Sequence, residues 1–178
     1  VILNGEVTPA DKKAEIMKKE LQWCKSVLDA SDKKWRIVMT HAGPYTSNHD
    51  PLDVRDYYIN DSEYSLDAMG VDLFLNGHDH IYIRSTVKND IKVNTGDGTT
   101  YLTGGTVGNK FYEYIPARSD YSTDFYTDEE DKQVFSVIEF SEDSIKGTAY
   151  QKQDPDNWNS FKAVDSYEIR NTLREGKD

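Results

Sequence analysis

The chain has 178 residues, of which 37% are hydrophobic and 12% aromatic, so it is long enough to close one hydrophobic core. Its formal net charge of −11 argues against a nucleic-acid partner, because binding a phosphate backbone needs clustered lysine and arginine. No run reaches the ~18 apolar residues that a membrane span needs, so we expect no membrane insertion.

The N-terminal part of the chain predicts a strand and a long helix. The apolar run 1–3 is typical of a buried strand whose neighbours precede Val1, so we expect the chain to start in mid-domain. Thr8 and Pro9 are favoured residues at a helix start and predict a helix over residues 9–29. Its apolar residues recur at spacings of three and four and predict one buried face, formed by Ala14, Met17, Leu21, Cys24 and Leu28. Cys24 is the one cysteine of the chain, so no intrachain disulfide can form.

Strands and a short helix then alternate along the chain. Residues 36–40 and 71–75 are apolar runs that predict buried strands. Between them lie a long polar loop and a helix predicted over residues 62–69, which Gly70 ends. This alternation predicts an α/β core with parallel strands, in which ligands bind at the loops beyond the carboxyl ends of the strands.

Beyond residue 80 the pattern changes to period-two runs. They predict an antiparallel continuation of the sheet, with strands at residues 81–87, 100–103, 134–140 and 144–151 and a hairpin turn at 141–143. Residues 106–131 are rich in Tyr, Asp and Glu and are predicted to be a surface insertion that some of its aromatic residues hold in place. Residues 171–178 are predicted to be a polar tail.

The chain has four histidines, His41, His49, His78 and His80, and all four fall in two loops that each follow a predicted strand. In the second loop Gly77 permits a tight turn, so His78 and His80 can approach one small volume. Neutral imidazole is a ligand for Zn, Fe, Mn or Ni. A single histidine is more often a surface or core residue, so from the residues alone a metal site and a structural role both stay open.

Two longer motifs resemble those of a known family. Residues 76–85, Asn-Gly-His-Asp-His-Ile-Tyr-Ile-Arg-Ser, are similar to the GHxHxYxR signature of the calcineurin-like metallophosphoesterases, particularly the purple acid phosphatase branch. Residues 38–45 resemble the strand-end histidine motif that precedes this signature in the family, and the likeness extends over most of residues 1–115. The resemblance implies an α/β fold of the sandwich type. Residues 1–170 would be the C-terminal portion of a single catalytic domain, the C-terminal half of an αββα sandwich with a mixed sheet whose C-terminal part is antiparallel.

The resemblance also implies roles for the histidines. His41 and His78 would bind one metal ion and His80 the other, in a pair of ions drawn from Fe, Zn and Mn. His49 would be the catalytic residue over the substrate phosphate, where it could protonate the leaving oxygen or stabilise its charge. Asp50 stands where the family often has a second histidine, and a solvated loop carboxylate is the favoured interpretation of this residue.

Other conspicuous residues favour structural roles. Tyr82 and Arg84 belong to the signature and are expected to lock the geometry of its loop. The glycine-rich segment 104–112 has no following helix and is therefore a poor phosphate cradle. The acidic run 128–131 lacks the spaced ligands of a calcium loop, which favours a solvated surface.

The function that the resemblance implies is bimetallic hydrolysis of phosphoesters, with small phosphomonoesters as the expected substrates and a phosphodiesterase or nucleotidase as the nearest alternative. The aspartate, asparagine-histidine and tyrosine ligands of the family have no counterpart in this sequence. We therefore expect the chain alone to be inactive and to pair with a missing N-terminal half, or with another copy in a homo-oligomer. A non-catalytic metal-binding or interaction module stays open. The family resemblance also leads us to expect an extracellular or cell-surface location.

Overall fold

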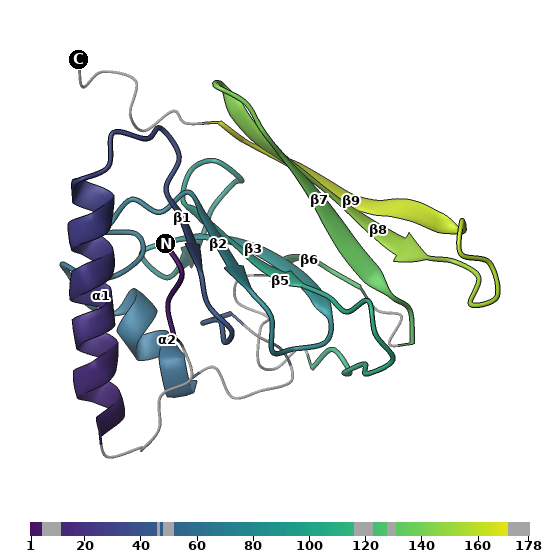
Figure 1. Cartoon of the computed structure of the whole chain (residues 1–178), viewed down its shortest axis with the longest axis horizontal. Coiled ribbons are helices and arrows are strands. Elements are labelled where there is room, and N and C mark those ends of the chain that lie inside the picture. Colours follow the sequence, from purple (N-terminus) through teal and green to yellow (C-terminus); the bar gives the residue numbers. More distant parts are fainter. Residues whose placement is uncertain (5–11, 46, 48–51, 116–122, 128–130, 171–178) are drawn as a thin grey trace.

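The computed structural model describes residues 1–4, 12–45, 47, 52–115, 123–127 and 131–170. The elements over these residues are α1 (Lys13–Asp29), β1 (Ile37–Met39), α2 (Leu52–Ile59), β2 (Leu73–Asn76), β3 (Tyr82–Lys88), β4 (Ile91–Lys92), β5 (Thr99–Gly104), β6 (Thr123–Tyr126), β7 (Val134–Phe140), β8 (Ser144–Lys152) and β9 (Phe161–Arg170). They form three layers, in which the helices cover one face of a mixed sheet and a second sheet covers the other face (Figure 1). The predicted α/β sandwich with a mixed sheet is therefore confirmed.

The mixed sheet, called sheet A, has the strand order β1-β2-β5-β3-β4, and β6 also pairs with β3. Strands β1, β2 and β5 are parallel, whereas β3 runs antiparallel to β5, β4 and β6. The strand predicted at residues 1–3 is reduced to one parallel bridge between Ile2 and Met39, next to β1. The carboxyl ends of β1 and β2 consequently meet at one end of sheet A.

Successive residues of the central strands face opposite layers, because side chains alternate along a strand. Phe74 and Tyr101 belong to the core cluster that includes the helix residues, whereas Leu73 and Leu102 belong to the cluster shared with the second sheet. The predicted buried face of α1 is confirmed for Met17, Leu21, Cys24 and Leu28. Ala14, near the start of this helix, is exposed instead.

The helix predicted at residues 62–69 is wrong, because this segment consists of turns. The Asp61 carboxylate accepts two backbone N–H groups of the following turn at 2.8 Å each, which is the pattern of a helix N-cap, yet no regular helix follows. The N–H of Leu66 donates to the carbonyl of Tyr58 in α2, a helix that forms within the predicted loop. Gly70 has φ of +63°, in agreement with its predicted role of ending the segment.

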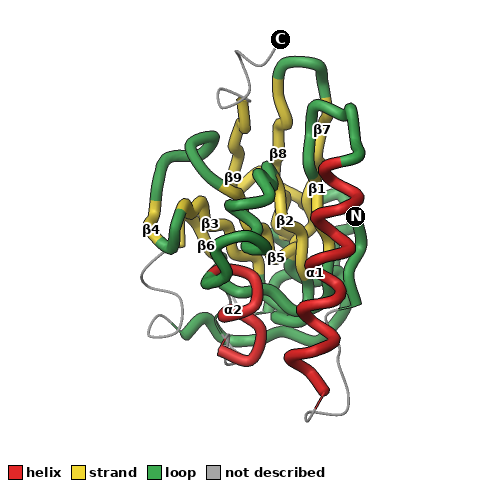
Figure 2. The backbone as a smooth tube through the Cα atoms, turned by 90° about the vertical axis from the view of Figure 1, so that its left-hand side faces the viewer, coloured by secondary structure: helices red, strands yellow, loops and turns green. Residues whose placement is uncertain are grey.

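The second sheet, called sheet B, corrects the expectation of a continuous sheet. Strands β7 and β8 are antiparallel and joined by the predicted turn at 141–143, but they pair with β9 in the separate order β7-β8-β9 (Figure 2). Sheet B forms because β7, β8 and β9 all have an apolar face that needs a cover, and its Ile145, Ala149 and Ile169 pack in one cluster with Leu73 of sheet A. The sequence analysis did not predict β9, nor β6 within the insertion.

Several predicted features lie outside the described residues. They are the helix start at residues 8–11, His49 and Asp50, most of the acidic run at 128–131, and the polar tail at 171–178. Within the part of the chain that is described, no helix combines the length and apolar character needed to cross a membrane.

Candidate metal centre

Two neighbouring loops bring His41 and His78 together. His41 follows β1, and the signature loop 76–80 follows β2, whose residue Leu75 pairs with Met39 of β1. The N–H of Gly77 donates to the carbonyl of His41 at 2.9 Å, which ties the two loops together just beyond the strands. The parallel pairing of β1 and β2 thus places both histidines at the same end of sheet A.

The two imidazoles face each other through their ring nitrogens. His41 Nε2 lies 3.1 Å from His78 Nδ1, and the ring centroids are 4.9 Å apart. Two imidazole nitrogens that share one ion at ~2.0–2.1 Å lie roughly 3.0–3.4 Å apart, so this pair fits joint ligation of one metal ion. His78 has φ of +68°, a conformation that is uncommon for residues other than glycine and that concentrates at functional sites.

His80 points to a different set of contacts. Its Nδ1 lies 3.0 Å from the carbonyl oxygen of Lys110, and its ring lies 4.9 Å from that of Tyr112. A carbonyl can only accept a hydrogen bond, so this contact puts the proton on Nδ1 and leaves Nε2 free as a metal ligand. Among the described residues, no group of three or more His, Cys, Asp and Glu side chains is arranged to hold an ion. The structure thus brings His41 and His78 together and places His80 beside residues 110–112.

Gly43 lets the two loops approach each other closely, which the sequence analysis missed. A Cβ atom at this position would lie 2.4 Å from Asn76 Cγ, closer than real Cβ contacts allow. The Asn76 amide cannot easily move away, because it is buried and donates to the Thr103 hydroxyl at 2.9 Å. The glycine directly before Pro44 was the sequence signal for this close approach.

Asp79 is a second residue whose role the sequence analysis missed. Its side chain is only 1% exposed, and its carboxylate accepts the backbone N–H of Ser47 at 2.8 Å. Ser47 Oγ in turn accepts the backbone N–H of Ile115 at 2.5 Å. Asp79 therefore ties the signature loop to the loop after β1, and Ser47 ties that loop to the segment beyond β5. The signal was an acidic residue placed directly between two histidines.

Tyr82 and Arg84 make contacts that agree with the predicted structural role. The Tyr82 hydroxyl donates to Asp165 at 2.8 Å, and Arg84 donates to the two oxygens of the same carboxylate at 2.7 and 3.1 Å. Burial has the largest effect and raises the pKa of Tyr82, and the negative charge of Asp165 raises it further. These bonds join β3 of sheet A to β9 of sheet B directly behind the signature loop.

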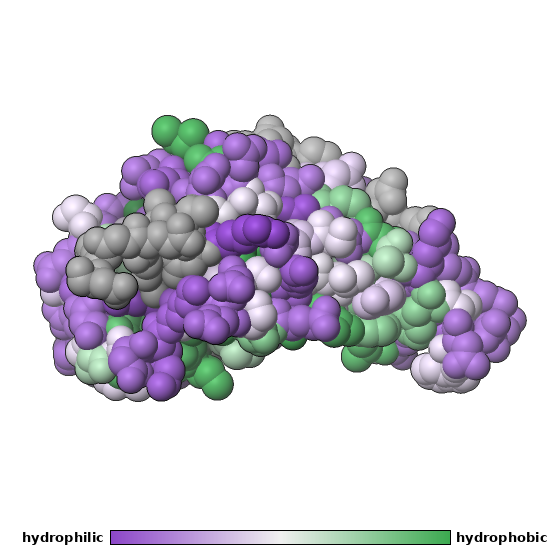
Figure 3. Space-filling model, turned by 90° about the horizontal axis from the view of Figure 1, so that it is seen from above, coloured by the Kyte–Doolittle hydropathy of each residue, from purple (hydrophilic) through white to green (hydrophobic). Residues whose placement is uncertain are grey.

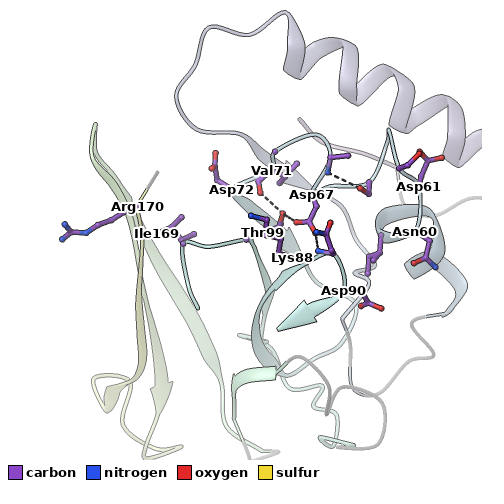
Figure 4. Close-up of a pocket in the computed structure, with 18 residues that line it drawn as sticks. Asn60, Asp61, Asp67, Val71, Asp72, Lys88, Asp90, Thr99, Ile169 and Arg170 are labelled. Atoms are coloured by element: carbon purple, nitrogen blue, oxygen red, sulfur yellow. Dashed lines mark hydrogen bonds between the residues drawn. The ribbon is translucent and has the colours of Figure 1, made fainter. Parts of the chain in front are cut away.

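A cavity of about 620 Å³ lies among the residues drawn in Figure 4. Its lining places it at the opposite end of β2 from the signature loop. It is bordered by Val71 and Thr99, at the starts of β2 and β5, and by Lys88 at the end of β3. Asp67 in its wall accepts the Thr99 hydroxyl at 3.0 Å and the N–H of Asn89 at 2.5 Å. This carboxylate therefore serves the fold, and among the described residues that line the cavity there is no histidine.

Comparison with known sequences gives two matches. Residues 3–82 match the calcineurin-like phosphoesterase family. Purple acid phosphatase 18 of Arabidopsis thaliana is 30% identical over 116 residues, which are 61% of this chain and 24% of that protein. The chain thus spans about a quarter of the length of this curated relative.

Three solved structures share the fold. GAP50, described as the anchor in the inner membrane complex of Plasmodium, has a TM-score of 0.67 and 17% identity, and the match covers 95% of this chain and 48% of that one. Purple acid phosphatase PPD1 from yellow lupin (Lupinus luteus) seeds has a TM-score of 0.61 and 17% identity, over 95% of this chain and 30% of that one. PhoD has a TM-score of 0.52 and 12% identity, over 90% and 38% of the two chains. The sequence matches confirm the resemblance to the purple acid phosphatase-like metallophosphoesterases, and the solved structures show that the fold is shared.

Proposed function

We propose that this chain, with its likeness to the calcineurin-like phosphoesterases, supplies the histidine ligands of a two-metal centre that hydrolyses phosphoesters. The observation that carries the proposal is the distance of 3.1 Å between His41 Nε2 and His78 Nδ1. These two nitrogens come from the carboxyl ends of adjacent parallel strands, the usual place for ligands in an open α/β sheet.

Each histidine has its own part in this proposal. His41 and His78 bind one ion, and His80 binds the other through Nε2 while the Lys110 carbonyl fixes its ring. His49, which lies outside the described residues, protonates the leaving oxygen. The chemistry that two ions drawn from Fe, Zn and Mn would supply there, when bound, is activation of a water and neutralisation of charge on the phosphoryl group. Neutral imidazoles alone leave the metal charges uncompensated, so the centre needs carboxylates from outside the described residues.

A complementary N-terminal half of the same catalytic domain is the proposed source of these carboxylates. Residues 1–3 and β7 are the edges of sheets A and B, and both lie on the same side of the molecule (Figure 2). Exposed apolar residues occur on both edges, namely Ile2, Met39, Val137 and Phe140. Figure 3 shows hydrophobic patches along the lower margin of the molecule in that view. An unpaired strand edge is a template for adding another strand. Mass measurement in solution separates this arrangement from a homo-oligomer of the chain.

The metal-ligand assignment is tested by titrating the chain with Zn²⁺ or Mn²⁺ and measuring the stoichiometry and the dissociation constant. We expect one weakly bound ion, lost in both His41→Ala and His78→Ala and retained in His80→Ala. The His80 variant is the matched control, because it removes the same side chain from the same loop. Equal losses in all three variants, or tight binding of two ions by the unmodified chain, would contradict the assignment.

Small phosphomonoesters are the proposed substrates of the complete protein, and diesters or nucleotides are the nearest alternative. A turnover panel with an aryl phosphate, a diester and a nucleotide separates them. An extracellular or cell-surface location is part of the same proposal and is tested by fractionating the source cells.

A non-catalytic metal-binding or interaction module is the second candidate function. The exposed apolar residues on the two strand edges favour an interaction role, because such residues mark surfaces that bind a partner. The complete protein decides between the two candidates. If no metal-dependent turnover of any phosphoester in the panel is found at saturating metal, the non-catalytic function is supported.

A further inference from the structure

The segment of residues 105–115 forms a fixed wall beside His80. Near its start, Val134 donates its N–H to the carbonyl of Thr106 at 2.8 Å. The Gln133 side-chain amide donates to the carbonyl of Val107 at 2.8 Å. At the other end, the N–H of Ile115 is bound to Ser47. A loop held by hydrogen bonds at both ends presents its side chains in a defined arrangement.

Lys110 is the basic residue of this wall. Its carbonyl oxygen lies 3.0 Å from His80 Nδ1, and its ammonium lies 4.8 Å from the centre of the Tyr112 ring. That ring is itself 4.9 Å from the His80 ring. The Tyr112 face attracts the ammonium and favours its position near His80, within roughly one Debye length of ~8–10 Å.

The negative net charge of the protein makes a lysine beside the site favourable for binding an anion. The chain has a net charge of −11, which repels a phosphate ester that carries two negative charges. A lysine ammonium at the edge of the site offsets this repulsion locally and forms charge-assisted hydrogen bonds to phosphate oxygens. Lys110 is exposed and hence accessible to an incoming anion.

We infer that Lys110 binds a phosphate oxygen of the substrate, while its own backbone carbonyl holds His80 in place. This inference rests on the proposed function. It adds a substrate-binding cation from the segment after β5, outside the histidine motifs. The phosphate class that Lys110 recognises is an ester or inorganic phosphate with two negative charges, and the Tyr112 ring holds the ammonium in reach of it.

The test uses the complete protein with p-nitrophenyl phosphate as substrate and inorganic phosphate as competitive inhibitor. In Lys110→Gln we expect KM and the inhibition constant for phosphate to rise about tenfold, with kcat within about twofold, because one charge-assisted contact is lost. The dependence of kcat/KM on ionic strength becomes weaker. Lys110→Arg restores most of the affinity. Lys18→Gln removes the same charge from the exposed face of α1 and leaves all constants unchanged.

The outcomes separate the inference from the proposed function. If KM and the salt dependence are unchanged in Lys110→Gln, the inference is overturned. If the unmodified protein is active in the same assay, the proposed function still stands. A lower kcat with an unchanged KM would assign Lys110 only to holding His80 and would also overturn phosphate binding. If the unmodified protein hydrolyses no phosphoester, the proposed function fails, and calorimetric binding of inorganic phosphate then decides: equal affinities of the unmodified protein and Lys110→Gln refute the inference.

Discussion

Replacing Asp165 by alanine removes the acceptor that joins sheet B to the signature strand β3. The Asp165 side chain is 7% exposed and accepts hydrogen bonds from Tyr82 and Arg84. In the variant, the Arg84 guanidinium, itself 10% exposed, keeps an ion pair with Asp124 at 3.2 Å, and the Tyr82 hydroxyl loses its partner. The loss of the charge-assisted hydrogen bonds to Arg84 and of the acceptor for the buried Tyr82 hydroxyl together costs about 3–5 kcal/mol.

The assay is urea and thermal unfolding followed by circular dichroism. For a chain of this size we expect the melting temperature to fall by roughly 6–20 °C. Asp165→Asn keeps an acceptor oxygen without the charge and should lose less stability. Asp143→Ala is the control, because that carboxylate is 95% exposed and its removal should change the free energy of unfolding by less than about 0.5 kcal/mol. A loss below about 1 kcal/mol in Asp165→Ala would refute the reasoning.

Three further predictions concern single residues. Gly43→Ala should destabilise the chain by about 1–3 kcal/mol and weaken metal binding, because the new Cβ overlaps Asn76. Gly77→Ala is the control and should be tolerated, because its Cβ meets only ordinary contacts at 3.9 Å. Equal melting curves of the two variants would contradict this prediction. Asp79→Ala should cost about 1–3 kcal/mol in urea unfolding, because it leaves a buried N–H without its acceptor, and a change below ~0.5 kcal/mol would argue against the tether. Burial raises the pKa of Cys24 to about 11, so iodoacetamide at pH 8.5 should label the folded chain ~100-fold more slowly than the urea-unfolded chain, and similar rates would disprove this burial.

The Cys24 thiol also predicts the direction of a pH effect. Its pKa in the folded chain is about 11, above the ~8.5 of an unfolded thiol. The stability that this group contributes is therefore fully present below pH ~8.5 and is lost as the pH rises toward 11, because the unfolded chain releases its proton first. Urea unfolding of Cys24→Ser and of the unmodified chain at pH 7 and pH 10 measures how much the thiol contributes to the pH dependence of the free energy of unfolding. A pH dependence equal to that of the unmodified chain would contradict the assignment.

Local patterns predicted the elements whose signal lies within a short stretch of sequence. The apolar stripe of α1 predicted the buried residues Met17 and Leu21, and Gly70 was placed correctly at the end of its segment. The helix at 62–69 failed because the N–H of Leu66 donates to the carbonyl of Tyr58 in α2, a tertiary contact that apolar spacing does not reveal. Strand β9 was missed because its exposed and buried positions do not alternate regularly.

The sequence by itself placed His41 and His78 in two loops that each follow an apolar run typical of a buried strand, and only the family resemblance assigned these two histidines to one metal ion. Only the tertiary structure decided that the Lys110 carbonyl fixes His80 and that Arg84 is held by Asp165, 81 residues further along the chain. The physical reason is that such contacts arise when separate layers pack. Sheet B must cover the apolar face of sheet A, and the side chains that then face each other have no fixed spacing in the sequence.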